Sequence, residues 1–574
     1  MTGTYSPTPE QAAIVAHAGS AFITACPGAG KTRTMVERAR QLMADGGDRR
    51  GVAFLSFTNA AVDELESRLR SFDILPTPLF PSFIGTFDRF LWQFFVAPFG
   101  LDNCETTPRL IPDKREWLIQ PHPTMQPLPL HAFDRRTGKV NRLIAAKLGY
   151  PSDRDVARHE ECARKVMATA LANGHVDFED VRLCVRARLD QKAFASRLGA
   201  ALAARFREVV VDEAQDCNPE DLEIVQWLRD AALIVKVICD PNQSIYQFRG
   251  GVADELNKFA ERFAPCDRLP MSGNFRSTPA ICSAIVALRP PASRVNPDQA
   301  LGRYKDDATP AYILAYGGTT VPDSIGKKFN EITRSLGILA AGAPVLASRR
   351  ITAAKAIGQP SLEESEHITL VLAKAVTDFH FSFGLGNRRE TLAGLHRAVL
   401  LTQNKIGSLG EYHEYVAANA LDDGSWRPGI IEVASALRFR DGMNAAGWLT
   451  IARDRLAPGF AGAGTIGRRL RSHPKLAAAL ANPPVDFHPA RTIHSAKGLE
   501  FPAVCIVLTI KKAGDILAHL EGVGGADAGE DARKIYVGAS RAQRLLVVAV
   551  PKSKASRLSS LLTSLGTATV ITHV

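Results

Sequence analysis

Short runs of apolar residues alternate along the chain with stretches in which apolar residues recur every three or four positions. A short continuous apolar run is typical of a buried strand, whereas the wider spacing places apolar side chains on one face of a helix. The runs lie at residues 21–24, 52–57, 83–87, 208–211, 233–240, 311–314, 344–348 and 545–550. The pattern therefore predicts an α/β protein in which buried strands alternate with amphipathic helices.

The run at 21–24 leads into a turn with two glycines, ACPGAGKT at residues 25–32, and then into a helix. The apolar face of that helix consists of Met35, Val36, Ala39, Leu42 and Met43. In such a strand–turn–helix unit, successive backbone N–H groups point at phosphate oxygens while the positive end of the helix faces the same charge. The stretch therefore predicts a binding site for a nucleoside triphosphate.

The residue types in this turn fit that chemistry. Gly28 and Gly30 permit the tight curl that side chains would block. Lys31 would reach the β and γ phosphates, and the Thr32 hydroxyl would be a ligand of Mg²⁺. The other predicted nucleotide contacts here are Ala25, Pro27, Ala29 and Arg33. Ala25 stands where the full pattern has glycine, so the alternative from this stretch alone is a chance glycine turn.

Two carboxylates and an amide follow later predicted strands. We expect Asp212 to bind Mg²⁺ and Glu213 to orient or deprotonate the attacking water, since phosphoryl transfer requires such groups. Gln243 would contact the γ-phosphate and a second ligand. Gln11, near the start of the first predicted helix, is placed to bind the edge of adenine. The alternatives are a helix cap for the acidic pair and an ordinary surface glutamine at position 11.

Net charge and cysteine content narrow the class of protein. The chain has 574 residues, enough for several domains, and a formal charge of +11, which favours an anionic partner. The alternative is that the composition is slightly rich in arginine and that this has no functional meaning.

Nine cysteines without a CxxC pair argue against a zinc ribbon or a disulfide framework. No signal peptide and no apolar run of the roughly 18 residues that a membrane span needs is present. We expect a soluble, cytoplasmic protein with no membrane partner.

From about residue 98 the composition changes. Prolines interrupt the chain, and the segment that follows to about residue 201 is predicted to be helical and basic. Its basic residues, predicted to form a cationic surface, are Arg135, Arg136, Lys139, Arg142, Lys147, Arg154 and Arg158. Either a nucleic-acid contact or an ordinary solvated helix face would explain them. An interruption between strands of one sheet predicts an inserted subdomain.

Several polar and aromatic residues after predicted strands are candidates for contact with nucleic acid. Threonine and asparagine can hold a sugar-phosphate backbone through neutral hydrogen bonds, and aromatic rings beside a cation can stack unpaired bases. The candidates are Phe57, Thr58, Asn59, Thr86, Tyr246, Phe248 and Arg249. The structural alternatives are that Thr58 and Asn59 form the N-cap of the following helix and that Tyr246 and Phe248 lie in a core.

This set of stretches resembles the motifs of superfamily 1 DNA helicases of the UvrD/Rep/PcrA type. MSGNFRSTP at 271–279 is similar to motif IV, TIHSAKGLEF at 492–501 to motif V and YVGASRA at 536–542 to motif VI. The resemblance implies that Phe275 stacks on adenine and that Arg276 touches the γ-phosphate. It further implies DNA contacts for His494 and Ser495, a position near the ribose for Glu500, and the role of arginine finger for Arg541.

The resemblance also implies an architecture of two RecA-like parallel-sheet motor domains, each interrupted by a mainly helical insertion. The predicted motor domains are residues 1–96 with 202–262, and residues 263–356 with 485–574. The predicted insertions are residues 97–201 and a shortened accessory domain at 357–484. ATP would then sit between two lobes. Phe248 replaces the usual tryptophan, and Asp88 replaces a frequent histidine, so no DNA contact is assigned to Asp88.

The expected activity is that of a DNA-dependent ATPase that moves 3′ to 5′ on single strands and unwinds duplex, with ATP and Mg²⁺ as cofactors. The expected partners are single-stranded and tailed duplex DNA, with the protein a monomer or weak oligomer. No nuclease-like carboxylate cluster is expected beyond Ala542. One alternative is therefore a DNA-sensing regulatory ATPase that controls a partner nuclease or other DNA-processing protein, in an anti-phage system resembling Gabija. Another is a P-loop ATPase unrelated to nucleic acid.

If Phe248 stacks a base, Phe248→Ala should weaken single-strand binding by ~1–3 kcal/mol. Titration of a labelled oligonucleotide measures this change. An unchanged affinity would instead assign Phe248 to the core.

Overall fold

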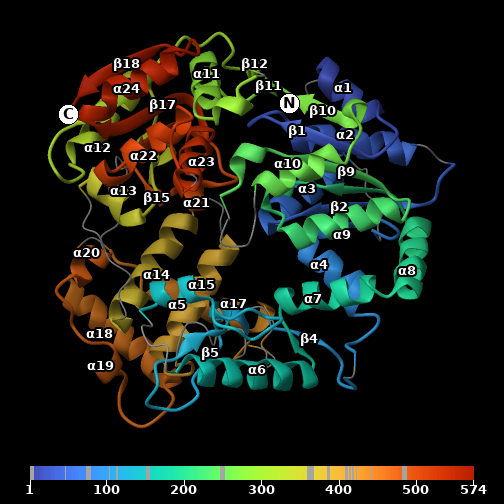
Figure 1. The fold of residues 1–574 in the computed structure, drawn as a ribbon. Coiled ribbons are helices and arrows are strands. Elements are labelled where there is room, and N and C mark those ends of the chain that lie inside the picture. The colour runs from blue at the N-terminus through green and yellow to red at the C-terminus, as the bar shows by residue number, and fades with distance from the viewer. Residues whose placement is uncertain are drawn as a thin grey trace. The chain divides into compact units, whose positions relative to one another are not determined.

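The computed structural model describes residues 6–44, 47–72, 79–102, 104–111, 114–149, 155–245, 253–295, 297–358, 367–383, 388–407, 423–440, 442–480, 488–525 and 527–574, with residues 412, 415, 416, 419 and 421 (Figure 1). The chain divides into two compact units. The first combines Met1–Leu91, Arg186–Ser361 and Val485–Val574, and the second combines Trp92–Val185 and Leu362–Pro484.

The first unit contains two six-stranded sheets, and all strands of each are parallel. In spatial order the first sheet consists of β10 (Arg268–Met271), β1 (Ala21–Ala25), β9 (Ile234–Cys239), β8 (Phe206–Val211), β2 (Gly51–Ser56) and β3 (Phe83–Thr86). The predicted α/β class with parallel sheets is confirmed.

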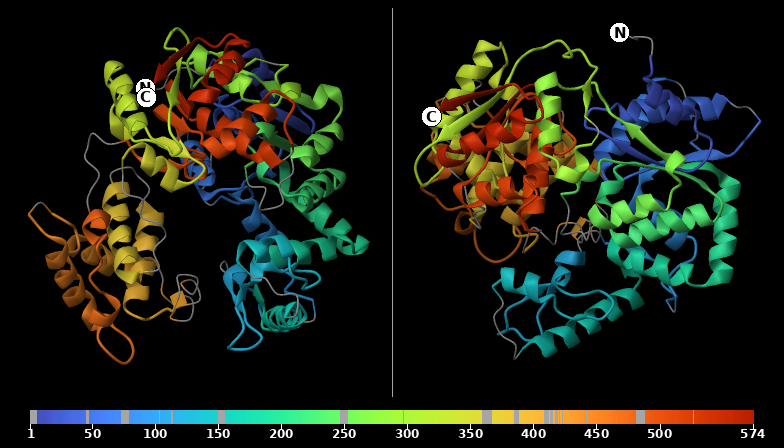
Figure 2. Two further views of the ribbon diagram at one scale, coloured as in Figure 1. Left: turned by 60° about the vertical axis from the view of Figure 1, so that its left-hand side comes forward. Right: turned by 45° about the horizontal axis from the view of Figure 1, so that its top comes forward.

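Alternation along β1 shows why helices cover both faces of this sheet (Figures 1 and 2). Phe22 packs against Phe259 and Phe263 on one face, with ring centroids 6.4 and 5.7 Å away. Ile23 points to the other face, into a core with Met35. The helices on the Ile23 face are α1 (Pro9–Ala16), α2 (Lys31–Ala44) and α3 (Asn59–Ser71). The opposite face carries α9 (Pro219–Asp230) and α10 (Ala253–Glu261).

The second sheet is assembled mainly from the last third of the chain. In spatial order its strands are β15 (Ala490–Thr492), β14 (Val345–Ala347), β16 (Phe501–Val507), β17 (Ala542–Pro551), β13 (Ala311–Tyr316) and β18 (Thr569–His573). A short parallel pair, β11 (Gly273–Asn274) with β12 (Gln299–Ala300), stands outside both sheets.

Two cores sandwich this sheet because successive side chains of β17 point to opposite faces. Leu546 and Val548 lie in one core, and Val547 and Ala549 lie in the other. The first core is closed by α11 (Pro279–Ala287), α21 (Ile493–Ala496), α22 (Ile510–Leu520), α23 (Asp527–Ala539) and α24 (Lys552–Thr563). The second is closed by α12 (Ser324–Ser335) and α13 (Arg350–Ala356).

The first insertion begins where α4 (Phe87–Leu91) passes into a π-helical turn, Trp92–Val96. Its elements are β4 (Arg109–Leu110) with β7 (His175–Val176), β5 (Leu118–Ile119) with β6 (Leu128–Pro129), α5 (Arg142–Lys147), α6 (Val156–Ala172) and the start of α7 (Phe178–Leu189). The prediction of a cationic surface is wrong for Arg135, which is buried and forms an ion pair with Asp177 at 2.6 Å. A buried guanidinium with a carboxylate partner is a structural element, not a free surface charge.

The second insertion is helical, as predicted. It consists of α14 (Ile368–Phe383), α15 (Arg388–Thr402), α17 (Asp423–Ala436), α18 (Ala445–Leu456), α19 (Ile466–Arg469) and α20 (Leu476–Leu480). Trp448 is fully buried at the centre of its core, and its indole N–H donates to the carbonyl of Leu437 at 2.7 Å. Neighbouring helices α14 and α15 pack side by side (Figure 2).

Two boundaries differ from the predicted ones. β10 lies beyond the predicted boundary at 262, yet it pairs with β1 and so belongs to the first sheet. The predicted boundary at 201 cuts α8 (Lys192–Arg205), which belongs to the first unit and leads directly into β8. The remaining predicted boundaries stay predictions. Across the described residues, no helix combines the length and the apolar character that crossing a membrane requires.

None of the nine cysteines, all of which lie among the described residues, is in a disulfide. Cys26, Cys217 and Cys239 are buried, and burial raises the pKa of the Cys26 and Cys239 thiols. These thiols therefore fill space as small apolar side chains do.

The second insertion contains an acid-sensitive histidine. Burial lowers the pKa of His396 to about 4, while its ring stacks on Trp426 at 4.2 Å and Nδ1 lies 3.0 Å from the Tyr412 hydroxyl. Between pH 6.5 and 4 the unfolded chain binds a proton that the folded chain does not, so stability should fall as the pH falls through this window, by ~1–2 kcal/mol. Thermal unfolding of the full chain at pH 7 and pH 4.5 measures this loss. His396→Gln should reduce it, whereas exposed His122→Gln should not; equal acid sensitivity in both variants would contradict the assignment.

Candidate nucleotide site

The predicted strand–turn–helix unit is present at residues 21–44. Gly28 and Gly30 have φ values of +71° and +76°, in the left-handed region that favours glycine. A Cβ atom on Gly28 would also lie 2.6 Å from Oδ1 of Asn274. Both glycines are therefore required by the backbone of the turn.

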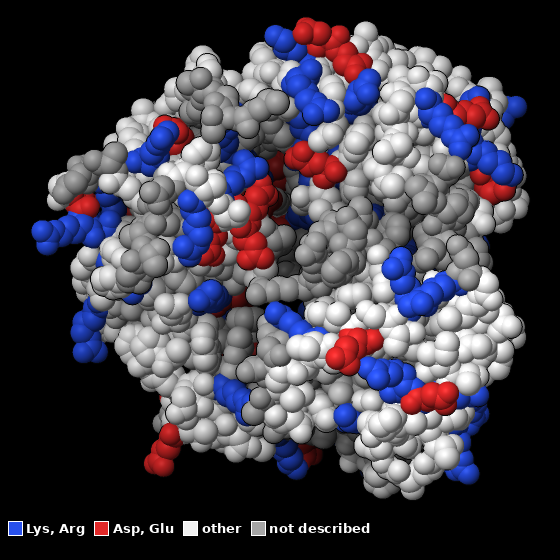
Figure 3. Space-filling view, turned by 180° about the vertical axis from the view of Figure 1, so that it is seen from behind, with Lys and Arg blue, Asp and Glu red and all other residues white. Residues whose placement is uncertain are grey.

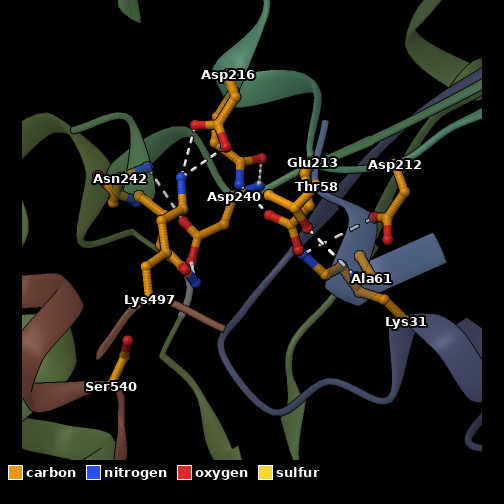
Figure 4. Close-up of polar contacts among 12 residues, drawn as sticks. Lys31, Thr58, Ala61, Asp212, Glu213, Asp216, Asp240, Asn242, Lys497 and Ser540 are labelled. Carbon is orange, nitrogen blue, oxygen red and sulfur yellow. Dashed lines mark hydrogen bonds and ion pairs between the residues drawn. The ribbon is translucent and has the colours of Figure 1, made fainter. Parts of the chain in front are cut away.

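The neighbouring strands of the first sheet bring the predicted acidic residues to this turn. β8 ends just before Asp212 and Glu213, and β9 ends just before Asp240. Parallel strands end at the same edge of a sheet, where ligands of α/β proteins bind. Lys31 Nζ lies 2.7 Å from Glu213 Oε1 and 3.9 Å from Asp212 Oδ1 (Figure 4). The structure thus joins three residues that the sequence places far apart.

Burial and charge set the protonation of these groups. Burial acts against the charge of Lys31, but Glu213 and Asp212 outweigh it and raise the pKa of Lys31. Burial raises the pKa of Asp212 to about 6. Burial would also raise the pKa of Glu213, yet the charges of Lys31 and Lys497 hold it at about 2. Glu213 is therefore an ionised carboxylate at neutral pH.

Asp212 is suited to bind a cation. Its Oδ1 atom is buried and accepts no hydrogen bond. A buried anionic oxygen without a donor is costly unless a cation neutralises it. Thr32 lies half-buried in the first turn of α2. Among the described residues, no three or more His, Cys, Asp or Glu side chains are grouped so that they could hold a metal ion by themselves.

The second sheet contributes two arginines. Arg541, 4% exposed, donates from Nη2 to Gln243 Oε1 at 2.8 Å. Arg276 forms an ion pair with Glu500 and donates to the Ser540 carbonyl at 2.7 Å. Burial, then the charge of Arg276, lowers the pKa of Arg541 to about 10. The Arg541 guanidinium therefore remains charged at neutral pH.

Gln11 and Phe275 both contact the turn. The Phe275 N–H donates to the Gly28 carbonyl at 2.9 Å, and its ring reaches within 3.9 Å of where a Cβ of Gly30 would be. Gln11 is buried, so the alternative of a surface glutamine is wrong. Its amide donates to the Ala29 carbonyl at 3.0 Å and accepts from the Thr8 N–H at 3.1 Å. Both ends of this amide contact protein, so Gln11 supports the turn directly, and its adenine contact stays a prediction.

The remaining predicted nucleotide residues divide by exposure. Pro27 and Ala29 are buried in the turn together with Ala25 at the end of β1, whereas Arg33 is exposed on α2. We call the parts of the first unit built around its first and second sheets the first and second lobes. Glu500 also accepts from Gln543 at 3.2 Å, so its carboxylate lies between two partners of the second lobe, Arg276 and Gln543. Its predicted contact with ribose remains a prediction.

The predicted DNA residues of the first lobe make local contacts. Thr58 Oγ1 accepts from the Ala61 N–H at 3.3 Å as the N-cap of α3, the structural alternative (Figure 4). Thr86 Oγ1 accepts from the Arg89 N–H at 3.1 Å. Phe57 stacks on Phe87 with centroids 5.3 Å apart. The exposed residues of this set are Thr58 and Asn59.

In the second lobe, Ser495 is exposed and its hydroxyl donates to the Thr492 carbonyl at 2.9 Å. His494 Nε2 lies 3.3 Å from the Ile245 carbonyl, and burial lowers its pKa, so the ring is neutral at pH 7. Tyr246, Phe248 and Arg249 lie outside the described residues. On the face shown in Figure 3, the basic side chains of described residues are interspersed with acidic ones.

Sequence reasoning missed a second charged contact across the lobes. Lys497 Nζ lies 2.6 and 2.7 Å from the two carboxylate oxygens of Asp216, and both side chains are buried (Figure 4). Lys497 lies inside the stretch similar to motif V at 492–501, and Asp216 lies three residues after Glu213. These neighbouring motifs were the available signal, since nothing in the sequence states which residues of two distant stretches will pair.

The site depends on residues from both sheets of the first unit. Lys31 and Gln243 follow neighbouring strands of the first sheet, and Arg541 of the second sheet contacts Gln243. This arrangement defines the class of P-loop proteins built from two RecA-like lobes. The sequence matches the UvrD/REP helicase N-terminal domain over residues 7–106 and 130–264, and the UvrD-like helicase C-terminal domain over residues 489–553. The chain belongs to the UvrD/Rep helicase family.

Curated relatives agree with this family. The chain is 26% identical over 305 residues to ATP-dependent DNA helicase UvrD2 of Mycobacterium tuberculosis, covering 48% of this chain and 42% of that protein. It is 28% identical over 316 residues to UvrD1 of the same organism, covering 48% and 38%. It is 25% identical over 297 residues to DNA helicase II of Escherichia coli, covering 49% and 39%. The matches thus span well under two thirds of each relative.

Lys31→Ala should lower ATP turnover by about 100-fold or more, because the phosphates lose their buried cation. The chain should still fold, since Glu213 keeps its hydrogen bond from Gln215. Phosphate release and thermal unfolding measure the two effects. The matched control is Lys327→Ala, which removes an exposed lysine ion-paired with Asp323 on α12. Substantial turnover by Lys31→Ala would refute the phosphate-site assignment.

Proposed function

We propose that this chain is an ATP-dependent motor that translocates on single-stranded DNA, 3′ to 5′, and unwinds duplex DNA. The observation that carries the proposal is the hydrogen bond from Arg541, on the second lobe, to Gln243 at the edge where the first lobe would hold phosphate. An arginine supplied from a second lobe can stabilise charge on a transferred phosphoryl group only when the lobes close. The relatives named as ATP-dependent DNA helicases support the same activity.

The ion pair between Lys31 and Glu213 suggests how nucleotide binding prepares hydrolysis. A triphosphate would draw the Lys31 ammonium toward its β and γ oxygens and release a carboxylate oxygen of Glu213. The released carboxylate, ionised at neutral pH, can then orient or deprotonate water. Mg²⁺, held by Thr32 and Asp212, would neutralise phosphate charge.

The two lobes supply the rest of the chemistry. Arg276 and Arg541 would stabilise the charge that develops on the γ-phosphoryl group. When that group leaves, the guanidinium groups lose an anionic partner and the closed arrangement is weakened. Hydrolysis would therefore alternate closed and open lobes.

Strand movement follows if each lobe holds DNA. The proposed contacts of the first lobe are Phe57, Thr58, Asn59, Thr86, Tyr246, Phe248 and Arg249. Those of the second are His494 and Ser495. Because the two groups lie on different lobes, closure and opening would shift one relative to the other along the strand.

The ATPase rate with and without single-stranded DNA, followed by strand displacement on oppositely tailed duplexes, tests the proposal. We expect DNA to stimulate turnover, and a 3′-tailed duplex but not a 5′-tailed one to be unwound. Turnover that responds to DNA without any displacement would instead indicate a regulatory ATPase that controls a partner nuclease. Turnover that ignores DNA would contradict both.

Arg541→Ala should keep nucleotide binding and lose DNA-stimulated turnover by about 100-fold or more, as expected for an arginine finger. Fluorescent nucleotide titration and phosphate release separate the two effects. Arg544→Ala is the matched control, since Arg544 lies on β17, which begins directly after Arg541, and pairs with Asp307 within the second lobe. Normal turnover by Arg541→Ala would remove its assigned role.

A further inference from the structure

A buried carboxylate, Asp240, stands between the two groups on which proposed catalysis depends. It follows β9 and is 2% exposed. Oδ1 accepts from the Asn242 N–H at 3.1 Å, and Oδ2 accepts from Gln243 Nε2 at 2.8 Å. Oδ2 also accepts from the Tyr536 hydroxyl at 2.9 Å. Among the described residues no lysine or arginine lies within ion-pair distance of this carboxylate, so its direct partners are hydrogen-bond donors.

Asp240 determines which way the Gln243 amide points. A carboxylate can only accept hydrogen bonds and a guanidinium can only donate them. Because Asp240 accepts from Nε2, Oε1 of Gln243 is directed at Arg541, from which it accepts at 2.8 Å. In the reverse orientation, the Gln243 amide oxygen would face the Asp240 carboxylate, acceptor against acceptor. The Gln243 amide nitrogen would face the Arg541 guanidinium, donor against donor.

A second glutamine, Gln215, contacts the backbone N–H of Asp240 and not its carboxylate. Gln215 accepts from the Asp240 N–H at 3.1 Å, and its Nε2 donates to Glu213. A continuous chain of hydrogen bonds therefore leads from Glu213 through Gln215, Asp240 and Gln243 to Arg541. Its members are all buried or, in the case of Glu213, half-buried.

Tyr536 ties this chain to the second lobe. It lies on α23, is fully buried, and is the one described residue of that lobe whose side chain donates to Asp240. If α23 moves away, Asp240 loses the Tyr536 hydroxyl as a donor, so the position of the lobe and the alignment of Gln243 are energetically linked.

We propose that Tyr536 and Asp240 are a positioning pair that aligns Gln243 with Arg541, and Gln215 with Glu213, when the lobes close. This inference rests on the proposed function, because it concerns the same hydrolysis. It adds two positioning residues whose part is to transmit lobe closure to the reacting groups.

Tyr536→Phe removes one hydroxyl and tests the pair. The kcat of DNA-stimulated ATP hydrolysis should fall about tenfold while the KM for ATP stays within about twofold, because alignment for hydrolysis is lost and nucleotide contacts are kept. The matched control is Tyr316→Phe, which removes another buried hydroxyl, one that donates to the Leu508 carbonyl at 2.7 Å within the second lobe. This control should match the wild type in kcat.

Tyr536→Phe with wild-type kcat would overturn the inference and leave the proposed function standing. A wild-type chain without ATP hydrolysis would overturn the proposed function and the inference together. If Tyr536→Phe does not fold, Asp240→Asn is tested in its place. The new amide nitrogen would face either Gln243 Nε2 or the Asn242 N–H, so two donors meet in both orientations. A loss of kcat at constant KM supports the inference, and an unchanged kcat overturns it.

Discussion

The buried charge of Lys31 is the constraint around which the first lobe is arranged. A buried ammonium is tolerated only beside anions, and Glu213 and Asp212 supply them from the end of β8. That requirement makes β1 and β8 end at one edge, with β9 between them. The turn can lie this close to Asn274 only because Gly28 has no Cβ atom, which would be 2.6 Å from Asn274 Oδ1. Charge pairing and backbone geometry therefore select the same arrangement.

Three side-chain contacts between the lobes of the first unit are polar. Lys497 with Asp216, Arg541 with Gln243, and Tyr536 with Asp240 cross from one sheet to the other. Each contact depends on donors and acceptors meeting at hydrogen-bond distance, so its energy falls steeply when the lobes move. The energy of an apolar interface of similar extent would differ less between closed and slightly open lobes, because hydrophobic burial is not directional.

Residues proposed to hold DNA have local structural tasks as well. Thr58 and Thr86 accept hydrogen bonds from backbone N–H groups of the helices that follow them. A hydroxyl that caps a helix through its oxygen still has a hydrogen to donate. The capping contacts therefore orient these hydroxyls without excluding a phosphate partner, and the two interpretations of each threonine are compatible.

Local sequence determined the elements and the chemistry of the first site. Apolar runs located buried strands, and the glycine turn, the acidic pair at 212–213 and the motif-like stretches around Arg276 and Arg541 indicated a nucleotide site, because these depend on residue type and short-range spacing. Only the tertiary structure decided that β10 joins the first sheet, that Arg135 is buried, that Gln11 supports the turn and that Tyr536 meets Asp240. Those outcomes depend on which distant segments become neighbours, and a donor in one stretch carries no mark of the acceptor it will find in another.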